Sequence, residues 1–214
     1  MSFAMRICAA MVLMGIFGVP AWAADVKLSE PQTEGGKGVF SVLKNRTSAA
    51  SETFPTGKVS QEELSTLLWA ASGLNRPEKG WTVPMAMGRE PYCRIYVAAD
   101  EGAFLYDWKE HALKEISADN VKGLVGAQPF VGKGSHVLIF VVGGKSLEAF
   151  RDTDVAANWG QVAAGAMTQN VYLAAEALDI GVRYIASLKA DAVRSAFKLD
   201  EKDIPVCIMP IGKK

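Results

Sequence analysis

The sequence predicts an α+β fold, in which helices surround a central sheet of about five strands, mixed or antiparallel. The first observation is the order of the expected elements: helices, hairpin, helix, strand, helix, strand, helix, strand. The second is the continuous apolar run within residues 136–142, which is typical of a buried central strand. The third is the stretch 158–180, which is so apolar that a helix there must be buried on most sides.

Two of the expected helices have clear end signals. The long helix over 158–180 has Asn158 as a plausible N-cap and Gly181 just past its end. A second helix begins after Ser60, because Ser60 and Glu63 form a capping box ahead of regularly spaced apolar residues. Shorter helices are expected over 38–44, 118–125, 146–151 and 191–198.

The expected strands are short and mostly apolar. Residues 93–99 and 103–108 form a hairpin, since the Asp-Glu-Gly sequence between them is a turn signal. The remaining strands are expected over 136–142, 182–186 and 204–211.

The beginning of the chain has the pattern of an export signal. Arg6 precedes an apolar run over 7–19, and Ala21-Trp22-Ala23 matches an A-x-A cleavage site. The run is too short to span a bilayer as a helix. We therefore expect a signal peptide over 1–23 and a single domain over 24–214. The mature protein is expected in the periplasm, without a membrane span.

Composition argues against several classes of function. The 23 basic and 23 acidic residues balance, so no nucleic-acid partner is indicated. His111 lies in a polar stretch and is expected to be solvated, and His136 is expected to be structural. With two histidines and no G-x-S-x-G sequence, neither a serine hydrolase nor a metal site is predicted. Gly144-Lys145-Ser146 lacks the earlier glycine that a phosphate loop needs.

The predicted mature chain keeps two cysteines, Cys93 and Cys207. An exported pair could form a disulfide. Both lie in apolar, strand-like segments, where free buried cysteines are common, and the sequence favours that alternative.

Polar residues at two separate places could bind a ligand. Arg46-Thr47-Ser48 offers a guanidinium and two hydroxyls, and Gly212-Lys213-Lys214 adds positive charge after the last expected strand. If these segments meet, they form an anion site; otherwise both are solvated surface. Gln169 and Asn170 lie inside the long helix and need hydrogen-bond partners, either a neighbouring loop or groups around a ligand.

Six stretches carry a more specific pattern in a fixed order. They are RTS (46–48), LSTLLWAASGLNRP (64–77), TVPMAMG (82–88), GAQPFV (126–131), TQNVYLAAEALDIG (168–181) and the closing MPIGKK. Together they resemble the FMN-dependent nitroreductase superfamily, and most of all its branch of azoline-oxidising flavin dehydrogenases. The resemblance covers nearly all of the expected mature chain.

The resemblance implies a homodimer with two FMN molecules at the subunit interface. Small residues over 160–166 fit this, because they would let a second helix approach closely. In this arrangement Arg46, Ser48 and Lys213 hold the phosphate. The full set of implied FMN-binding residues is Arg46, Thr47, Ser48, Pro84, Met85, Ala86, Gln128, Asn170, Ala186, Ser187, Gly212 and Lys213.

The resemblance also assigns residues to the flavin ring. Gln128 would bond its polar edge, and residues 84–86 would pack on the ring from the other subunit. Ala186 and Ser187 would place backbone N–H groups near N5, while Asn170 would brace the surrounding loops.

The expected function is that of an FMN-dependent oxidoreductase. It would transfer a hydride, or two electrons, through flavin N5 to or from a small organic substrate. No side chain of the protein is expected to be catalytic, because the cofactor supplies the redox chemistry. Two alternatives remain, a non-catalytic flavin-binding module and a cofactor-free interaction module of the same fold.

Overall fold

The computed structural model describes residues 24–76, 80–85, 89–144, 148 and 153–214. The expected signal peptide and most of the expected helix over 146–151 lie outside these residues. The strands are β1 (Val26–Lys27), β2 (Cys93–Ala98), β3 (Ala103–Asp107), β4 (Ala112–Ser117), β5 (His136–Val142), β6 (Ile180–Val182) and β7 (Ile204–Lys213). The helices are α1 (Val39–Asn45), α2 (Gln61–Ser72), η2 (Val131–Lys133), α4 (Thr153–Ala177) and α5 (Ala190–Ala196).

One sheet of seven strands forms the centre of the molecule, in the order β1-β4-β3-β2-β5-β7-β6. Every neighbouring pair is antiparallel. The α+β class is confirmed, but the expected strand number of about five was too low. The two additional strands are β1 and β4. β1 has only two residues, and β4 has only a weak alternation of apolar and polar side chains, so neither has a strong sequence signal.

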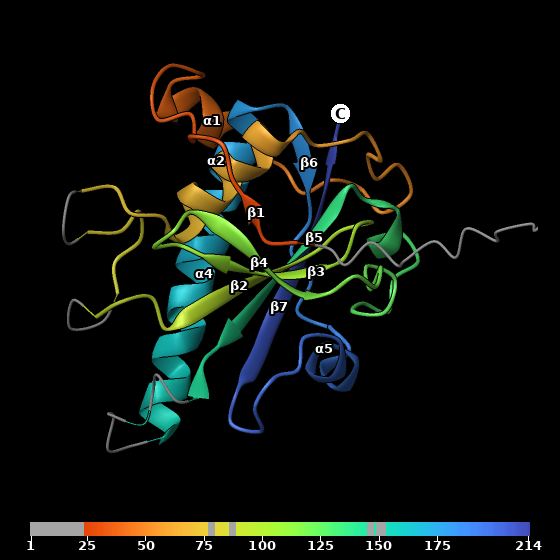
Figure 1. Cartoon of the computed structure of the whole chain (residues 1–214). Helices are drawn as coiled ribbons and strands as arrows, with labels where there is room; N and C mark the ends of the chain where they lie inside the picture. The colour runs from red at the N-terminus through yellow and green to blue at the C-terminus, as the bar shows by residue number, and fades with distance from the viewer. Residues whose placement is uncertain (1–23, 77–79, 86–88, 145–147, 149–152) are drawn as a thin grey trace, which may run out of the picture.

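The sheet has a buried core on each face. α2 and α4 cover one face, where residues such as Leu67, Met167 and Met209 pack together. α5 and the loops around Val125 and Phe130 cover the other face. Figure 1 shows α4 on one side of the sheet and α5 on the other. β5 lies between these two layers, and this explains why its sequence is continuously apolar.

The long helix α4 is displaced toward the N-terminus from its expected range of 158–180. It begins at Thr153, so Asn158 is an exposed residue within the helix and not its N-cap. It ends at Ala177, and Asp179 then adopts a left-handed conformation with φ of 55°. Gly181 was expected to end the helix but pairs with Gly212 in the sheet.

Local hydrogen bonds explain why one of the other expected helices is present and why another is not. Ser60 and Glu63 form the expected capping box at the start of α2. The expected helix over 118–125 is wrong, because this segment forms turns. Asn120 accepts a hydrogen bond from the backbone N–H of Lys122 at 3.2 Å, and the buried Lys122 ammonium donates to the Gly134 carbonyl at 2.9 Å. These contacts compete with helical hydrogen bonding.

Cys93 and Cys207 are both buried and free. Cys93 lies on β2 and Cys207 on β7, with β5 between the two strands. Two strand spacings alone separate their Cα atoms by at least roughly 9–10 Å, and an offset of two residues along β5 adds to this. This exceeds the separation of about 7 Å that a disulfide can bridge, so the favoured alternative of two free thiols is confirmed.

His111 does not have the solvated environment that its polar sequence suggests. It is half-buried, and its Nε2 lies 2.7 Å from Ser65 Oγ and 3.1 Å from the Ser29 carbonyl. Its Nδ1 lies 2.9 Å from the hydroxyl of Tyr106. Burial lowers the pKa of His111. The histidine therefore links the segment around Ser29 to α2 and β3, and the expectation of a solvated side chain was wrong.

His136 is the source of one prediction about stability and pH. Burial at the start of β5 lowers its pKa to about 4. An unfolded chain would bind this proton near pH 6.5, so stability falls as pH decreases from about 6.5 to about 4. As the pH falls from 7 to 5, we expect the lowered pKa of His136 to decrease the free energy of unfolding by about 2 kcal/mol. Urea unfolding of the wild type and of His136→Gln at both pH values measures this difference. Equal pH dependence in the two proteins would contradict it.

No helix within the described ranges combines the length and apolar character needed to cross a bilayer.

Candidate functional site

The loop after α1 meets the last two strands, as the proposed anion site requires. The Ala49 N–H donates to the Val182 carbonyl at 2.9 Å, and the Lys213 N–H donates to the Gly57 carbonyl at 2.8 Å. Gly212 lies so close to Pro55 that a Cβ at position 212 would collide with the Pro55 carbonyl. The segment over 46–57 therefore runs beside β6 and the end of β7.

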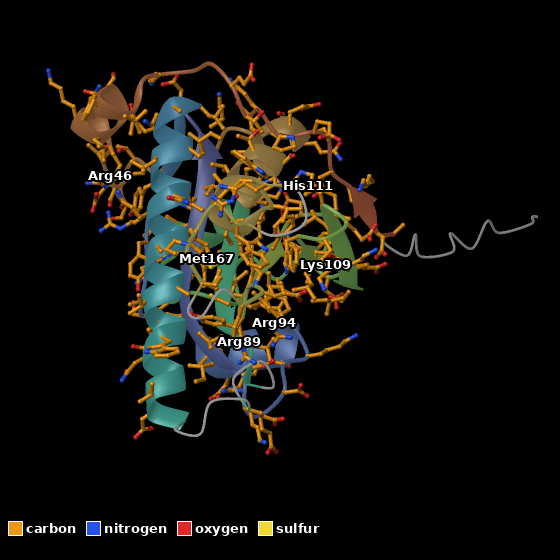
Figure 2. The ribbon with its side chains drawn as sticks, turned by 90° about the vertical axis from the view of Figure 1, so that its left-hand side faces the viewer. Arg46, Arg89, Arg94, Lys109, His111 and Met167 are labelled. Carbon is orange, nitrogen blue, oxygen red and sulfur yellow. The ribbon has the colours of Figure 1, made fainter. Side chains whose placement is uncertain are left out.

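Tyr172 of α4 contacts both Arg46 and Ser48. Its hydroxyl accepts the backbone N–H of Tyr184 at 2.8 Å, and it lies 2.8 Å from Ser48 Oγ. The guanidinium carbon of Arg46 lies 5.0 Å from the centre of the Tyr172 ring. Figure 2 shows Arg46 beside α4, on the opposite side of that helix from Met167. Arg46 and Ser48 thus come together at one side chain of α4, and Thr47 between them is exposed.

The ammonium group of Lys213 is bound elsewhere and not beside Arg46 and Ser48. Its ammonium pairs with Glu63 at 2.5 Å and donates to the Leu178 carbonyl near the end of α4 at 2.6 Å. Glu63 also forms the capping box of α2, so Lys213 is bound into the junction of two helices. The interpretation of Lys213 as a phosphate ligand is therefore not supported by its contacts. Its backbone, with that of Gly212, shapes the adjoining loop instead.

Arg183 supplies a second cation that the sequence reasoning missed. Its guanidinium donates to the Ala49 carbonyl at 2.9 Å and lies over the ring of Phe130, 6.0 Å from its centre. Phe130 in turn packs against Phe54, with 5.2 Å between ring centres. Arg183 follows directly after the short strand β6, and a basic residue at that position was the available signal. Arg46 and Arg183 therefore both belong to the region of the loop at 46–57.

Gln128 and Ser187, two of the residues assigned to the flavin ring, contact each other. Gln128 Nε2 donates to Ser187 Oγ at 3.0 Å. The Lys189 N–H donates to the Val125 carbonyl at 2.9 Å, which holds the two loops together. Gln128 Oε1 is buried and has no hydrogen-bond partner among the described residues. A buried acceptor without a partner is costly, so this atom is a candidate for contact with a ligand. Ala186, next to Ser187, is exposed.

Pro84 and Met85 lie elsewhere on the same chain. They line two neighbouring cavities of about 510 and 400 Å³, and the second is completed by apolar residues of α4, including Trp159 and Val162. Val162 and Tyr172 are ten positions apart, which corresponds to about 15 Å along a helix. Ala86 lies outside the described residues. One chain alone therefore does not bring this segment to Arg46 and Ser48.

Asn170 holds the 82–85 segment in place. Its Nδ2 donates to the carbonyls of Ala70 at 2.9 Å and Thr82 at 3.2 Å, which joins α4 to the end of α2 and to the loop that follows. This confirms that Asn170 bonds a neighbouring loop. Gln169 beside it is exposed.

Two helices present apolar or small side chains to the surface. On α1, Phe40 is 84% exposed and Val39 is 58% exposed. On α4, Val162 is 73% exposed, and a Cβ at Gly165 would meet nothing within 4 Å. Positions 161, 162, 165 and 169 are exposed and follow helical spacing, so they form one face of α4. Apolar patches of this kind often mark protein interaction sites.

The charged and polar groups of this region suit anion binding and ring contacts. The described parts of the chain contain no group of three or more His, Cys, Asp and Glu side chains that could bind a metal ion. The arrangement offers two guanidinium groups, hydroxyls and a buried amide oxygen that no described residue bonds.

Comparisons with known proteins agree with the fold. A family model described as the nitroreductase family matches residues 43–213. A candidate nitroreductase of Methanocaldococcus jannaschii is 29% identical over 166 residues, which is 71% of this chain and 80% of that protein.

Solved structures of known proteins share the fold of this chain. The chain is similar to a candidate nitroreductase of Ralstonia eutropha JMP134, with a TM-score of 0.82 and 29% identity, covering 89% of this chain and 90% of that chain. It also shares its fold with a chain of the E. coli microcin synthetase McbBCD complex. That match has a TM-score of 0.63 and 16% identity, and covers 98% of this chain and 84% of that one.

Proposed function

The chain belongs to the nitroreductase family, an oxidoreductase family that generally binds flavin, and on that premise we propose that it is an FMN-dependent oxidoreductase. It would act as a homodimer and transfer a hydride, or two electrons, to or from a small organic substrate. The observation that carries this proposal is the buried Gln128 Oε1 without a described partner, beside Ser187. That oxygen suits the N–H donor at the polar edge of an isoalloxazine ring.

The residues around the loop at 46–57 fit the phosphate of FMN. Arg46 and Ser48 meet at Tyr172, and Arg183 adds a second guanidinium near Ala49. Guanidinium groups form paired, charge-assisted hydrogen bonds with phosphate oxygens. Lys213 is neutralised by Glu63 and is left out of the proposed phosphate site.

The remaining contacts of the ring would come from a second subunit. Within one chain, Pro84 and Met85 lie near Val162 and Arg46 lies near Tyr172, about 15 Å apart along α4, so in the proposed dimer a partner's copy would supply them. The exposed apolar face of α1 and the open face of α4 around Gly165 would be buried in this dimer. Close approach of two helices is favoured where small residues leave room for a neighbouring backbone.

When bound, FMN would supply the two-electron chemistry, and the protein would supply position and electrostatics. Ala186 and Ser187 are exposed residues of the loop that Gln128 contacts, and their backbone N–H groups would favour negative charge on a reduced ring. The apolar surroundings of Pro84 and Met85 would exclude water from the ring face.

Turnover by the purified protein tests this function. With FMN bound, we expect an artificial electron donor to reduce the protein and a nitroaromatic or a quinone to reoxidise it. Bound flavin without turnover would favour the alternative of a non-catalytic flavin-binding module. Failure to bind flavin at all would favour the cofactor-free interaction module.

We also propose that the protein is exported to the periplasm, on the strength of the basic, apolar and A-x-A pattern of residues 1–23. Since NAD(P)H is expected to be scarce there, an assay with several classes of donor is needed to identify the physiological one.

A further inference from the structure

A cavity of about 510 Å³ lies beside the segment that the proposed dimer places at the flavin. Such a volume is typical of sites for small molecules. It is lined by Asn75, Arg76, Gly80, Trp81, Thr82, Val83, Pro84 and Met85. These residues come from one loop that leaves α2 and folds back on itself. The loop is held by a hydrogen bond from the Asn75 N–H to the Gly80 carbonyl at 3.1 Å, and by pairing of Leu74 with Trp81.

Arg76 gives this cavity a positive charge. Among the described residues, no Asp or Glu lines the cavity, and none forms an ion pair with Arg76. The guanidinium lies against Gly80, where any side chain at position 80 would collide with it. The Arg76 guanidinium therefore lies beside the backbone of Gly80. Arg76 is exposed, and a guanidinium can form paired N–H contacts with a carboxylate.

Trp81 also lines this cavity and carries a neutral hydrogen-bond donor. Its indole nitrogen is buried and has no hydrogen-bond partner among the described residues. The ring is oriented by an edge-to-face contact with Trp108, with 5.7 Å between ring centres and an angle of 84°. An indole N–H without an acceptor loses the hydrogen bond that water would give it, so a ligand oxygen there is favoured.

We propose that this cavity binds the carboxylate of a small aromatic acid, with Arg76 as the ion-pair partner and Trp81 as the second donor. The flat indole of Trp81 and the apolar side chains of Pro84 and Met85 would contact the ring of the acid. In the proposed dimer, Pro84 and Met85 also contact the flavin, so the acid would lie beside the redox centre. The role of the cavity as a substrate site rests on the proposed function, whereas the binding of the anion does not.

Binding to the flavin-free protein tests the anion site directly. Benzoate is titrated by calorimetry, with benzyl alcohol as a neutral ligand of the same shape. We expect benzoate to bind at least about tenfold more tightly than benzyl alcohol, because a hydrogen bond to a charged group contributes about 1.5–3 kcal/mol. Arg76→Gln should weaken benzoate binding about tenfold or more and leave benzyl alcohol unchanged.

Three further variants distinguish an effect of the Arg76 charge on binding from an effect of lost folding. Lys133→Gln removes an exposed positive charge outside the cavity and should bind benzoate like the wild type. Arg76→Lys should retain part of the affinity, since it keeps the charge but loses the planar pair of donors. Gly80→Ala should weaken binding by displacing the guanidinium. Circular dichroism of each variant measures whether the fold is retained.

The proposal is overturned if the wild type binds benzoate no better than benzyl alcohol, or if Arg76→Gln binds it as tightly as Lys133→Gln does. A turnover assay of the FMN-loaded enzyme then tests the substrate role. We expect kcat/KM for 4-nitrobenzoate to exceed that for 4-nitrobenzyl alcohol, and Arg76→Gln to remove the difference. Turnover without this preference would contradict the substrate role alone. A protein that binds benzoate but never FMN would contradict the proposed function instead.

Discussion

Arg46→Ala is expected to weaken FMN binding about ten- to a hundredfold. The guanidinium lies over Tyr172, beside Ser48, where the proposed function places the FMN phosphate. Loss of hydrogen bonds to a charged group costs about 1.5–3 kcal/mol, which corresponds to that range of affinity. The change is best measured by titrating FMN into the flavin-free protein and following the quenching of flavin fluorescence.

Lys44→Ala is a matched control for this substitution. Lys44 lies in the last turn of α1, two residues before Arg46, and its side chain is exposed. It should bind FMN like the wild type. Folding stability should change little in Arg46→Ala, because a cation–π contact of a partly exposed side chain contributes only about 0.5–1 kcal/mol. Equal FMN affinity in the two variants would remove Arg46 from the proposed phosphate site.

Gly165→Arg is expected to dissociate the proposed dimer. In a single chain this position of α4 faces open space, so the larger side chain has room, and replacing glycine within a helix removes an unfavourable residue. In a dimer packed on this face, the same side chain would overfill the interface and bury an unpaired charge. Together these effects should raise the dissociation constant about a hundredfold or more.

Sedimentation velocity over a range of concentrations measures this constant. Gly123→Arg is the matched control, since a Cβ there also meets nothing within 4 Å and the position lies in an exposed turn away from α4. Gly165→Arg should also lose FMN, because the partner's Pro84 and Met85 would no longer reach the ring. A Gly165→Arg protein that stays dimeric and keeps its flavin would show that α4 does not form the interface.

The elements that were predicted correctly have signals in neighbouring residues of the sequence. The capping box of Ser60 and Glu63 depends on neighbours three positions apart, and β5 is apolar because both of its faces are covered. The approach of the loop at 46–57 to the last strand followed from the resemblance and is found in the backbone hydrogen bonds of Ala49 and Lys213.

What could not be predicted depends on distant contacts. The orientation of the Lys213 side chain is decided by Glu63, 150 residues earlier, and by the end of α4. The environment of His111 is decided by Ser65 and Tyr106, so a polar local sequence gave the wrong expectation. The start of α4 was misplaced because the five residues before Asn158, TDVAA, are too few to show an apolar periodicity, and Asp154 and Val155 among them are exposed.

Native mass spectrometry of the purified mature protein, after incubation with excess FMN, tests the central claim most directly. The proposed function predicts a dimer that carries two FMN molecules, since each phosphate site at Arg46 requires the other subunit's Pro84 and Met85. A monomer, or a dimer without bound flavin, would contradict it.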